Sequence, residues 1–146
     1  MLELYFFVLG LVNSVFLIFI FLIRKNRSVI LQRIGWVYLL LAIPAAYGII
    51  LVAQEQKTVR YSIFLGIFLA FVLLEWLLDY VFKINFRENW RKNWKWMVPY
   101  LSLYYAMNYG FVVMPWKISL VWGLIMLGLF IIQITANLKS HPKMGK

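Results

Sequence analysis

The Lys and Arg residues of this chain fall into three clusters that are separated by long apolar runs. Twelve of the fifteen lie in these clusters: Arg24, Lys25, Arg27 and Arg33; Lys83, Arg87, Arg91, Lys92 and Lys95; Lys139, Lys143 and Lys146. Short cytoplasmic loops of membrane proteins accumulate Lys and Arg, and apolar runs of about 18 residues or more are typical of membrane-spanning helices. The pattern therefore predicts an all-α integral membrane protein whose basic loops all face the cytoplasm.

Five apolar segments alternate with these loops. We expect spans at about residues 4–23, 34–53, 61–82, 98–114 and 118–138, forming a single helical bundle over residues 1–146. Pro44 lies near the middle of the second span, where proline frees a carbonyl and kinks the helix. The fourth segment is the shortest, about 25 Å at 1.5 Å per residue, and the least lipid-like, because tyrosines and Asn108 interrupt it.

The distribution of basic residues indicates whether the fourth segment crosses. With five crossings and the N-terminus outside, twelve Lys and Arg residues are cytoplasmic and only Lys57, Arg60 and Lys117 are outside. Without that crossing, the ratio falls to ten against five. The positive-inside rule therefore predicts five transmembrane helices in the cell (plasma) membrane, with the N-terminus outside and the C-terminus in the cytoplasm.

The residue composition excludes several kinds of catalytic and metal site. The chain has no cysteine, and its single histidine, His141, lies in the polar tail. Disulfides, thiolate metal sites and cysteine nucleophiles are therefore excluded. No Gly-rich phosphate loop, His-Glu zinc pattern or nucleophile elbow is present. We expect no cofactor and no metal, and the residues favour a non-enzymatic function.

Residues 86–97 differ from the spans. Their apolar and aromatic side chains recur every three or four residues, on one helical face: Phe86, Trp90, Trp94 and Met97. A short helix lying in the cytoplasmic membrane interface explains this pattern, with the aromatic rings among headgroups and the basic groups on phosphates. We expect anionic lipid to bind Arg87, Trp90, Arg91, Trp94 and Lys95. Tryptophan interleaved with basic residues can also stack on RNA, but the adjacent membrane surface makes lipid the favoured partner.

Two carboxylates lie inside the third span, where ionisable groups are costly and usually functional. Asp79 is one turn from Lys83, so an i,i+4 ion pair near the interface explains it without a functional role. Glu75 lies eight residues before Lys83, about 12 Å deeper along the helix. At that depth its carboxyl group must be protonated, paired with a polar group or beside a hydrated cavity.

Other polar side chains occur at matching depths. Counted from the inner ends of their spans, Asn13 and Asn108 lie near the level of Glu75, and Gln133 lies closer to that of Asp79. The candidate ligand or ion site is therefore Glu75, Asp79, Asn108, Asn13 and Gln133. Hydrogen bonding that only holds the helices together is an equally strong alternative.

These observations favour a small, non-enzymatic, polytopic membrane protein with an intramembrane polar site. Its polar site around Glu75 would bind or conduct a cation, a proton or a small polar ligand, and it would act as a homo-oligomer because one chain has few helices to enclose a path. One alternative is an accessory subunit of a larger membrane complex, in which the polar residues meet a partner chain. Another is a lipid-handling enzyme with Asp79 and Glu75 as acid and base, although no nucleophile or metal-ligand set accompanies them.

Overall fold

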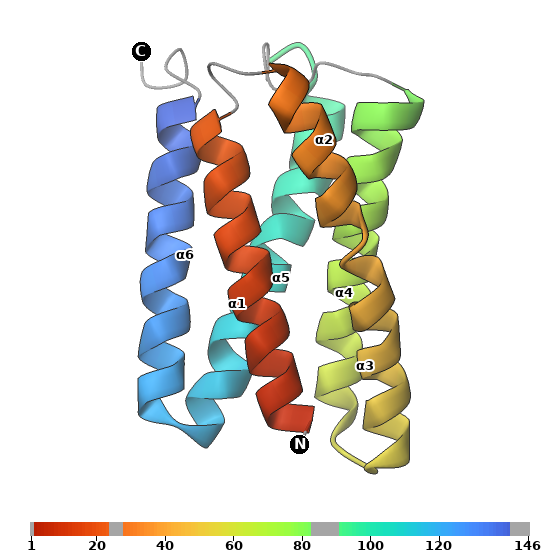
Figure 1. The fold of residues 1–146 in the computed structure, drawn as a ribbon, viewed down its shortest axis with the longest axis vertical. Helices are drawn as coiled ribbons and strands as arrows, with labels where there is room; N and C mark the ends of the chain where they lie inside the picture. The colour runs from red at the N-terminus through yellow and green to blue at the C-terminus, as the bar shows by residue number, and fades with distance from the viewer. Residues whose placement is uncertain (1, 24–27, 83–90, 141–146) are drawn as a thin grey trace.

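The computed structural model describes residues 2–23, 28–82 and 91–140, and every regular element in them is helical. The elements are α1 (Leu2–Ile23), α2 (Ser28–Leu39), α3 (Ala42–Gln54), α4 (Val59–Trp76), the π-helix η1 (Leu77–Val81), α5 (Trp94–Ile118) and α6 (Leu120–Ser140). The α2–α3 pair acts as one segment, as does α4 with η1, and successive segments run alternately between the two ends of the bundle (Figure 1). The predicted all-α class is confirmed for the described residues.

Four stretches are long and apolar enough to cross a membrane: Leu2–Ile23, Arg33–Gln54, Val59–Val81 and Leu120–Lys139. They coincide with four of the five expected spans. The remaining expected span, residues 98–114, lies within α5, which has sufficient length at 25 residues but is less apolar. Large apolar side chains such as Leu22, Ile43 and Val121 are exposed on the outside of the bundle. The architecture is therefore compatible with a multi-pass membrane protein.

The second expected span is divided at Leu40 and Leu41, between α2 and α3. Proline has no N–H, so Pro44 cannot donate a hydrogen bond to the Leu40 carbonyl. That carbonyl instead accepts a bond from the Ile43 N–H at 3.1 Å. The Pro44 carbonyl accepts a bond from the Tyr5 hydroxyl at 2.6 Å, which ties α1 to α3. The kink predicted at Pro44 is present, as a break between two helices.

The interfacial helix predicted at residues 86–97 lies only partly within the described residues, and the described part is continuous with α5. Residues 86–90 lie outside the described residues. Residues 91–93 form a turn, and Trp94 begins α5. Helical hydrogen bonding begins at Asn93, whose carbonyl accepts bonds from the Trp96 and Met97 N–H groups at 3.0 Å each. Pro99 follows near the helix start and removes only one backbone donor, so no boundary forms between residues 97 and 98.

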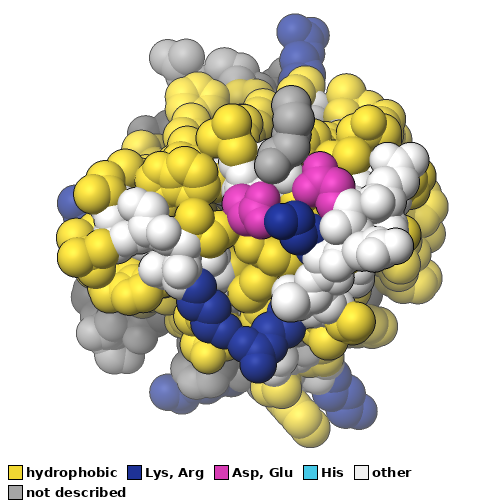
Figure 2. All heavy atoms as spheres, turned by 90° about the horizontal axis from the view of Figure 1, so that it is seen from below, with side chains coloured by type: hydrophobic (Ala, Val, Ile, Leu, Met, Phe, Trp, Pro, Cys, Tyr) yellow, Lys and Arg dark blue, Asp and Glu magenta, His cyan; other side chains and the backbone are white. Residues whose placement is uncertain are grey.

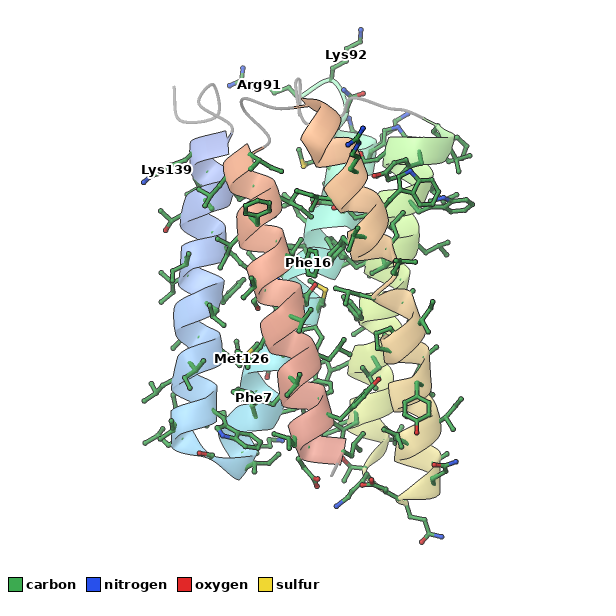
Figure 3. The ribbon with its side chains drawn as sticks, viewed as in Figure 1. Phe7, Phe16, Arg91, Lys92, Met126 and Lys139 are labelled. Atoms are coloured by element: carbon green, nitrogen blue, oxygen red, sulfur yellow. The ribbon has the colours of Figure 1, made fainter. Side chains whose placement is uncertain are left out.

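The first and last helices, α1 and α6, lie side by side and run in the same direction (Figure 1). The Phe7 ring stacks on Trp122, with ring centroids 4.5 Å apart, and Figure 3 places Phe7 and Met126 where the two helices meet. A Cβ atom on Gly10 would lie 2.9 Å from Met126 Cε and 2.8 Å from Phe111 Cδ1. Gly10 therefore allows α1, α5 and α6 to approach one another closely.

A tight turn at Ser119 joins α5 to α6. The Ser119 N–H donates to the Pro115 carbonyl at 2.9 Å, and the Gly123 N–H donates to the Ser119 carbonyl at 3.0 Å. A Cβ atom on Gly123 would lie 2.8 Å from Trp116 Cα and would overlap the Trp116 ring. The hairpin closes this tightly because residue 123 has no side chain.

Charged residues mark the two ends of the bundle. Figure 3 shows Arg91, Lys92 and Lys139 at the end opposite the N-terminus, which we call the basic end. Figure 2 views the other end, where acidic and basic side chains lie side by side among apolar ones. There Lys57 Nζ lies 2.8 Å from Glu3 Oε1, and this hydrogen bond to the carboxylate raises the pKa of Lys57. The ion pair connects the start of α1 to the turn between α3 and α4.

Candidate functional site

Polar side chains from five helices lie inside the bundle, and we call them the buried polar layer. It consists of Asn13 (α1), Tyr38 (α2), Glu75 (α4), Tyr100, Tyr104 and Asn108 (α5), and Gln133 (α6). Glu75 is half-buried, and the other members are at most 4 % exposed. Because buried polar groups cost free energy unless they are hydrogen-bonded, the partner of each group shows what the layer can do.

Asn13 joins α1 to α2 and α5. The Tyr38 hydroxyl donates a hydrogen bond to Asn13 Oδ1 at 2.7 Å, and Asn13 Nδ2 lies 3.9 Å from Met107 Sδ. Tyr38 occupies the last turn of α2, where its carbonyl accepts a bond from the Leu41 N–H at 3.0 Å. The break between α2 and α3 therefore comes directly after the residue that reaches Asn13.

Glu75 is bound by a tyrosine of the neighbouring helix α5. The Tyr100 hydroxyl donates to Glu75 Oε1 at 2.7 Å, a typical length for an O–H···O hydrogen bond. The Tyr100 ring is held against Phe71, with centroids 5.3 Å apart. Packing thus fixes the donor that faces the carboxyl group.

Tyr104 lies one turn further along α5 and binds α6. Its hydroxyl donates to Gln133 Oε1 at 3.0 Å, and its carbonyl accepts a bond from Asn108 Nδ2 at 2.9 Å. Tyr100, Tyr104 and Asn108 are four residues apart, which places all three on one face of the helix. This face of α5 therefore supplies the layer with contacts to both α4 and α6.

Two buried polar atoms have no hydrogen-bond partner among the described residues: Ser14 Oγ and Gln133 Nε2. Both side chains are almost completely buried, at 1 % and 0 % exposed. A buried donor without a partner costs about 1–3 kcal/mol. The Gln133 amide nitrogen is thus a buried donor of the layer whose hydrogen bond is not satisfied by the described residues.

Three tyrosine hydroxyl groups make the contacts of the layer between helices. Tyr38 bonds to Asn13, Tyr100 to Glu75 and Tyr104 to Gln133, so each of the three hydroxyl groups joins two helices. The layer therefore combines one carboxyl group, three phenols and three amides. In the described residues, no group of three or more His, Cys, Asp or Glu side chains is placed to hold a metal ion.

The five site residues expected from the sequence are placed as follows. Asn13, Asn108 and Gln133 are buried, and Glu75 and Asp79 are half-buried. Asn13, Glu75 and Gln133 each accept a hydrogen bond from a tyrosine, whereas Asn108 binds the backbone of its own helix. Tyr38, Tyr100 and Tyr104 were not expected in the site. The four-residue spacing of Tyr100, Tyr104 and Asn108 was the available signal.

Asp79 lies in the π-helix η1, where the Phe82 N–H donates to the Leu77 carbonyl at 2.8 Å. Such π turns often occur at functional sites. The expected partner of Asp79, Lys83, lies outside the described residues. The next residue, Tyr80, packs its ring 4.9 Å from that of Trp36 on α2. Asp79 thus lies beside an aromatic contact between α2 and η1.

The expected lipid-binding residues fall into two groups. Arg87 and Trp90 lie outside the described residues. Arg91, Trp94 and Lys95 are exposed at the basic end, in the turn before α5 and in its first residues.

Comparison with known proteins gives no further assignment, since no protein-family model, curated protein or solved structure matches this chain.

Proposed function

We propose that this chain is a membrane protein whose buried polar layer binds or conducts a cation, a proton or a small polar ligand at Glu75. The observation that supports this most directly is the carboxyl group of Glu75, bonded to Tyr100 at the margin of a layer drawn from five helices. The unpaired Gln133 amide in the same layer adds a donor that a polar ligand would satisfy. One chain has few helices to enclose a path, so conduction would take place in a homo-oligomer.

A comparison of two free energies, that of an interhelical hydrogen bond and that of placing a carboxylate in a membrane, favours a ligand site over a purely structural role for Glu75. A hydrogen bond between transmembrane helices contributes about 0.6 kcal/mol on average. A carboxylate at the centre of a span costs about 2.5–3.5 kcal/mol on insertion scales, and Glu75, six residues before the end of η1, carries part of that cost. A neutral Gln would accept the same bond from Tyr100 without that cost. A carboxyl group at this position is therefore best explained by use of its charge or its proton.

Reconstitution of the purified protein into liposomes tests this proposal. Proton, sodium and potassium movement would each be followed with an ion-sensitive dye, against protein-free liposomes. We expect one of these ions to move or to bind with the purified chain alone. If the chain handles none of them and co-purifies with another membrane protein, the function is that of an accessory subunit.

We further propose that α5 crosses the membrane as a fifth span, so that the basic end is cytoplasmic and the N-terminus is outside. The support is the charge pattern: Arg91, Lys92 and Lys139 lie at one end (Figure 3), while Lys57 at the other end is neutralised by Glu3. The lower hydropathy of α5 is explained by its tyrosines, two of which face the layer rather than lipid.

Cysteine labelling tests this orientation, because the chain has no native cysteine. In intact cells, Gln56→Cys should react with a membrane-impermeant maleimide, since Gln56 is exposed in the turn between α3 and α4. Lys139→Cys, exposed at the basic end, should react only after the membrane is opened. Labelling of Lys139→Cys but not Gln56→Cys in intact cells would overturn the orientation. Labelling of both from outside would mean that the chain crosses the membrane an even number of times between residues 56 and 139, which contradicts a crossing by α5.

We also propose that the exposed cations of the basic end contact anionic lipid. Replacing Arg91 and Lys95 with Gln should weaken binding to anionic nanodiscs by about 1 kcal/mol per residue, and added salt should reduce the difference. Arg60→Gln with Lys117→Gln is the matched control, since both residues are exposed near the opposite end. Equal losses from the two pairs would show that total charge, not the basic end, determines lipid binding.

A further inference from the structure

The outer face of α5 carries three side chains with hydroxyl groups. On one side, the Phe64 ring of α4 lies 6.1 Å from that of Tyr109. On the other side, the Phe130 ring of α6 lies 6.1 Å from that of Tyr105. Ser102, Tyr105 and Tyr109 are all exposed, and spacings of three and four residues place them on one side of the helix. We call these three residues the hydroxyl face.

The hydroxyl face differs from the outer faces of other helices because it carries unsatisfied polar groups. Every exposed residue of α1 is apolar, and the exposed hydroxyl of Thr135 on α6 donates to the Ile131 carbonyl of its own helix at 3.0 Å. A tyrosine hydroxyl lies too far from its own backbone to form such a bond. Neither Tyr105 nor Tyr109 makes a hydrogen bond among the described residues, so both hydroxyls are unsatisfied within one chain.

These two hydroxyls are unsatisfied at a depth where water does not compensate. In the expected span of residues 98–114, Tyr105 is seven residues from one end and Tyr109 is five residues from the other. The distances along the helix are about 10 Å and 8 Å, longer than a tyrosine side chain. The hydrocarbon region of a membrane offers no hydrogen-bond partner, so a second polypeptide is the natural source of one.

The chemistry of the hydroxyl face favours a second copy of this chain as that polypeptide. None of the three side chains carries a charge, so two such faces do not repel each other. A hydroxyl group both donates and accepts a hydrogen bond, so identical faces can satisfy each other. Two copies have the same orientation in the membrane and are related by a twofold axis along its normal. The two α5 helices would then be parallel, and each residue would meet its own counterpart.

The face continues along α5 as a seam suited to a second helix. Exposed and half-buried residues follow one another at alternating intervals of four and three, the seven-residue spacing of helices packed along their length: Val98, Ser102, Tyr105, Tyr109, Val112 and Trp116. Ser102 and Ala106, four residues apart, are small and let two backbones approach closely. The outer side of α5 therefore has both the shape and the hydrogen-bonding groups for a parallel helix pair.

We propose that the hydroxyl face of α5 is the contact surface between two copies of this chain in the membrane. The hydroxyls of Tyr105 and Tyr109 in each copy bond across the twofold axis, and Ser102 lets the helices approach. This inference rests on the proposed crossing by α5 and names the surface that joins the copies of the proposed homo-oligomer. It does not depend on what the buried polar layer binds.

Oxidative cross-linking in membranes provides the first test, because the chain has no native cysteine. With copper–phenanthroline and oxygen as oxidant, Ser102→Cys should give a disulfide-linked dimer that a reductant removes. Ile131→Cys is the matched control, since Ile131 is 56 % exposed on α6. It lies eight residues before Lys139, and Ser102 lies eight residues after Trp94, so the two thiols are at similar distances from the basic end. The control should remain monomeric.

Energy transfer between fluorophores on Lys139→Cys measures the strength of the contact in liposomes. Tyr105→Phe combined with Tyr109→Phe removes both hydroxyls and keeps the rings. The apparent dissociation constant should rise about threefold for each interhelical hydrogen bond lost. Tyr47→Phe makes the same change on a 51 % exposed tyrosine of α3 and should leave the constant unchanged.

The outcomes separate this inference from the proposed function. A chain that stays monomeric at every density in the membrane, or that cross-links more at Ile131→Cys than at Ser102→Cys, overturns the contact surface. Equal weakening by Tyr47→Phe and by the double α5 variant overturns the role of the hydroxyls. If α5 does not cross, Lys139→Cys and Gln56→Cys are labelled from the same side. A dimer that cross-links at Ser102→Cys but moves and binds no ion supports the surface and counts against the ion site alone.

Discussion

Glu75→Gln is expected to abolish ion or ligand handling in proteoliposomes while the bundle stays folded. The substitution keeps the size of the side chain, and its amide oxygen can still accept the hydrogen bond that Tyr100 now donates to Oε1. It removes the charge and the exchangeable proton. Loss of the insertion cost of a carboxylate should make the variant at least as stable as the wild type in thermal unfolding in detergent, so a loss of activity would be a chemical effect.

Two further carboxylates serve as comparisons. Asp79→Asn should reduce activity less than Glu75→Gln, because Asp79 lies in η1 nearer the end of the helix. Glu55→Gln makes the same chemical change at the opposite end, where Glu55 accepts a hydrogen bond from the Leu2 N–H at 3.3 Å, and should leave activity unchanged. Full activity in Glu75→Gln, or greater stability without loss of activity in Glu75→Leu, would show that Glu75 only holds helices together.

Gly123→Ala should cause the largest loss of stability from a single added methyl group. The new Cβ atom would lie 2.8 Å from Trp116 Cα, and a backbone atom cannot move away as a flexible side chain can. Overpacking of this kind costs about 1–3 kcal/mol, more than the gain of about 1 kcal/mol from the higher helix propensity of alanine. Thermal unfolding in detergent, followed by circular dichroism, would measure the difference.

The matched control lies on the same helix. A Cβ atom on Gly128 would meet no atom within 4 Å, so Gly128→Ala should gain helix propensity without a clash and leave the midpoint unchanged or higher. Equal destabilisation by both substitutions would mean that the turn between α5 and α6 does not depend on a close contact with Trp116.

Much of the fold could be predicted from apolar run lengths alone. Four expected spans coincide with helices that are long and apolar enough to cross a membrane, and the break near Pro44 follows from its missing N–H. Trp94 and Lys95 have the sequence pattern of an interfacial helix, but in the structure they begin α5, where the Asn93 carbonyl accepts the first helical hydrogen bonds. The π-helix had no sequence signal, since an i→i+5 bond depends on how neighbouring helices pack.

The buried site could be predicted only in part. Counting residues from the inner ends of the expected spans identified Asn13, Asn108 and Gln133 as candidates, and all three are buried in the structure. It could not identify their partners, because a linear pattern does not state which helices touch. Tyr38 was missed for this reason: it lies beside the break in the second span and reaches Asn13 across the α1–α2 contact.

The neighbouring positions of α1 and α6 set the order in which this chain can complete its structure during synthesis. α1 is synthesised before α6, yet Phe7 stacks on Trp122 and Gly10 lies against Met126. These contacts span almost the whole chain, and contacts distant in sequence form late. Asn13 and Ser14 are therefore synthesised before α6 exists to cover their helix. Until α6 has been made, the face of α1 that carries Phe7 and Gly10 has no partner, and its apolar surface stays exposed.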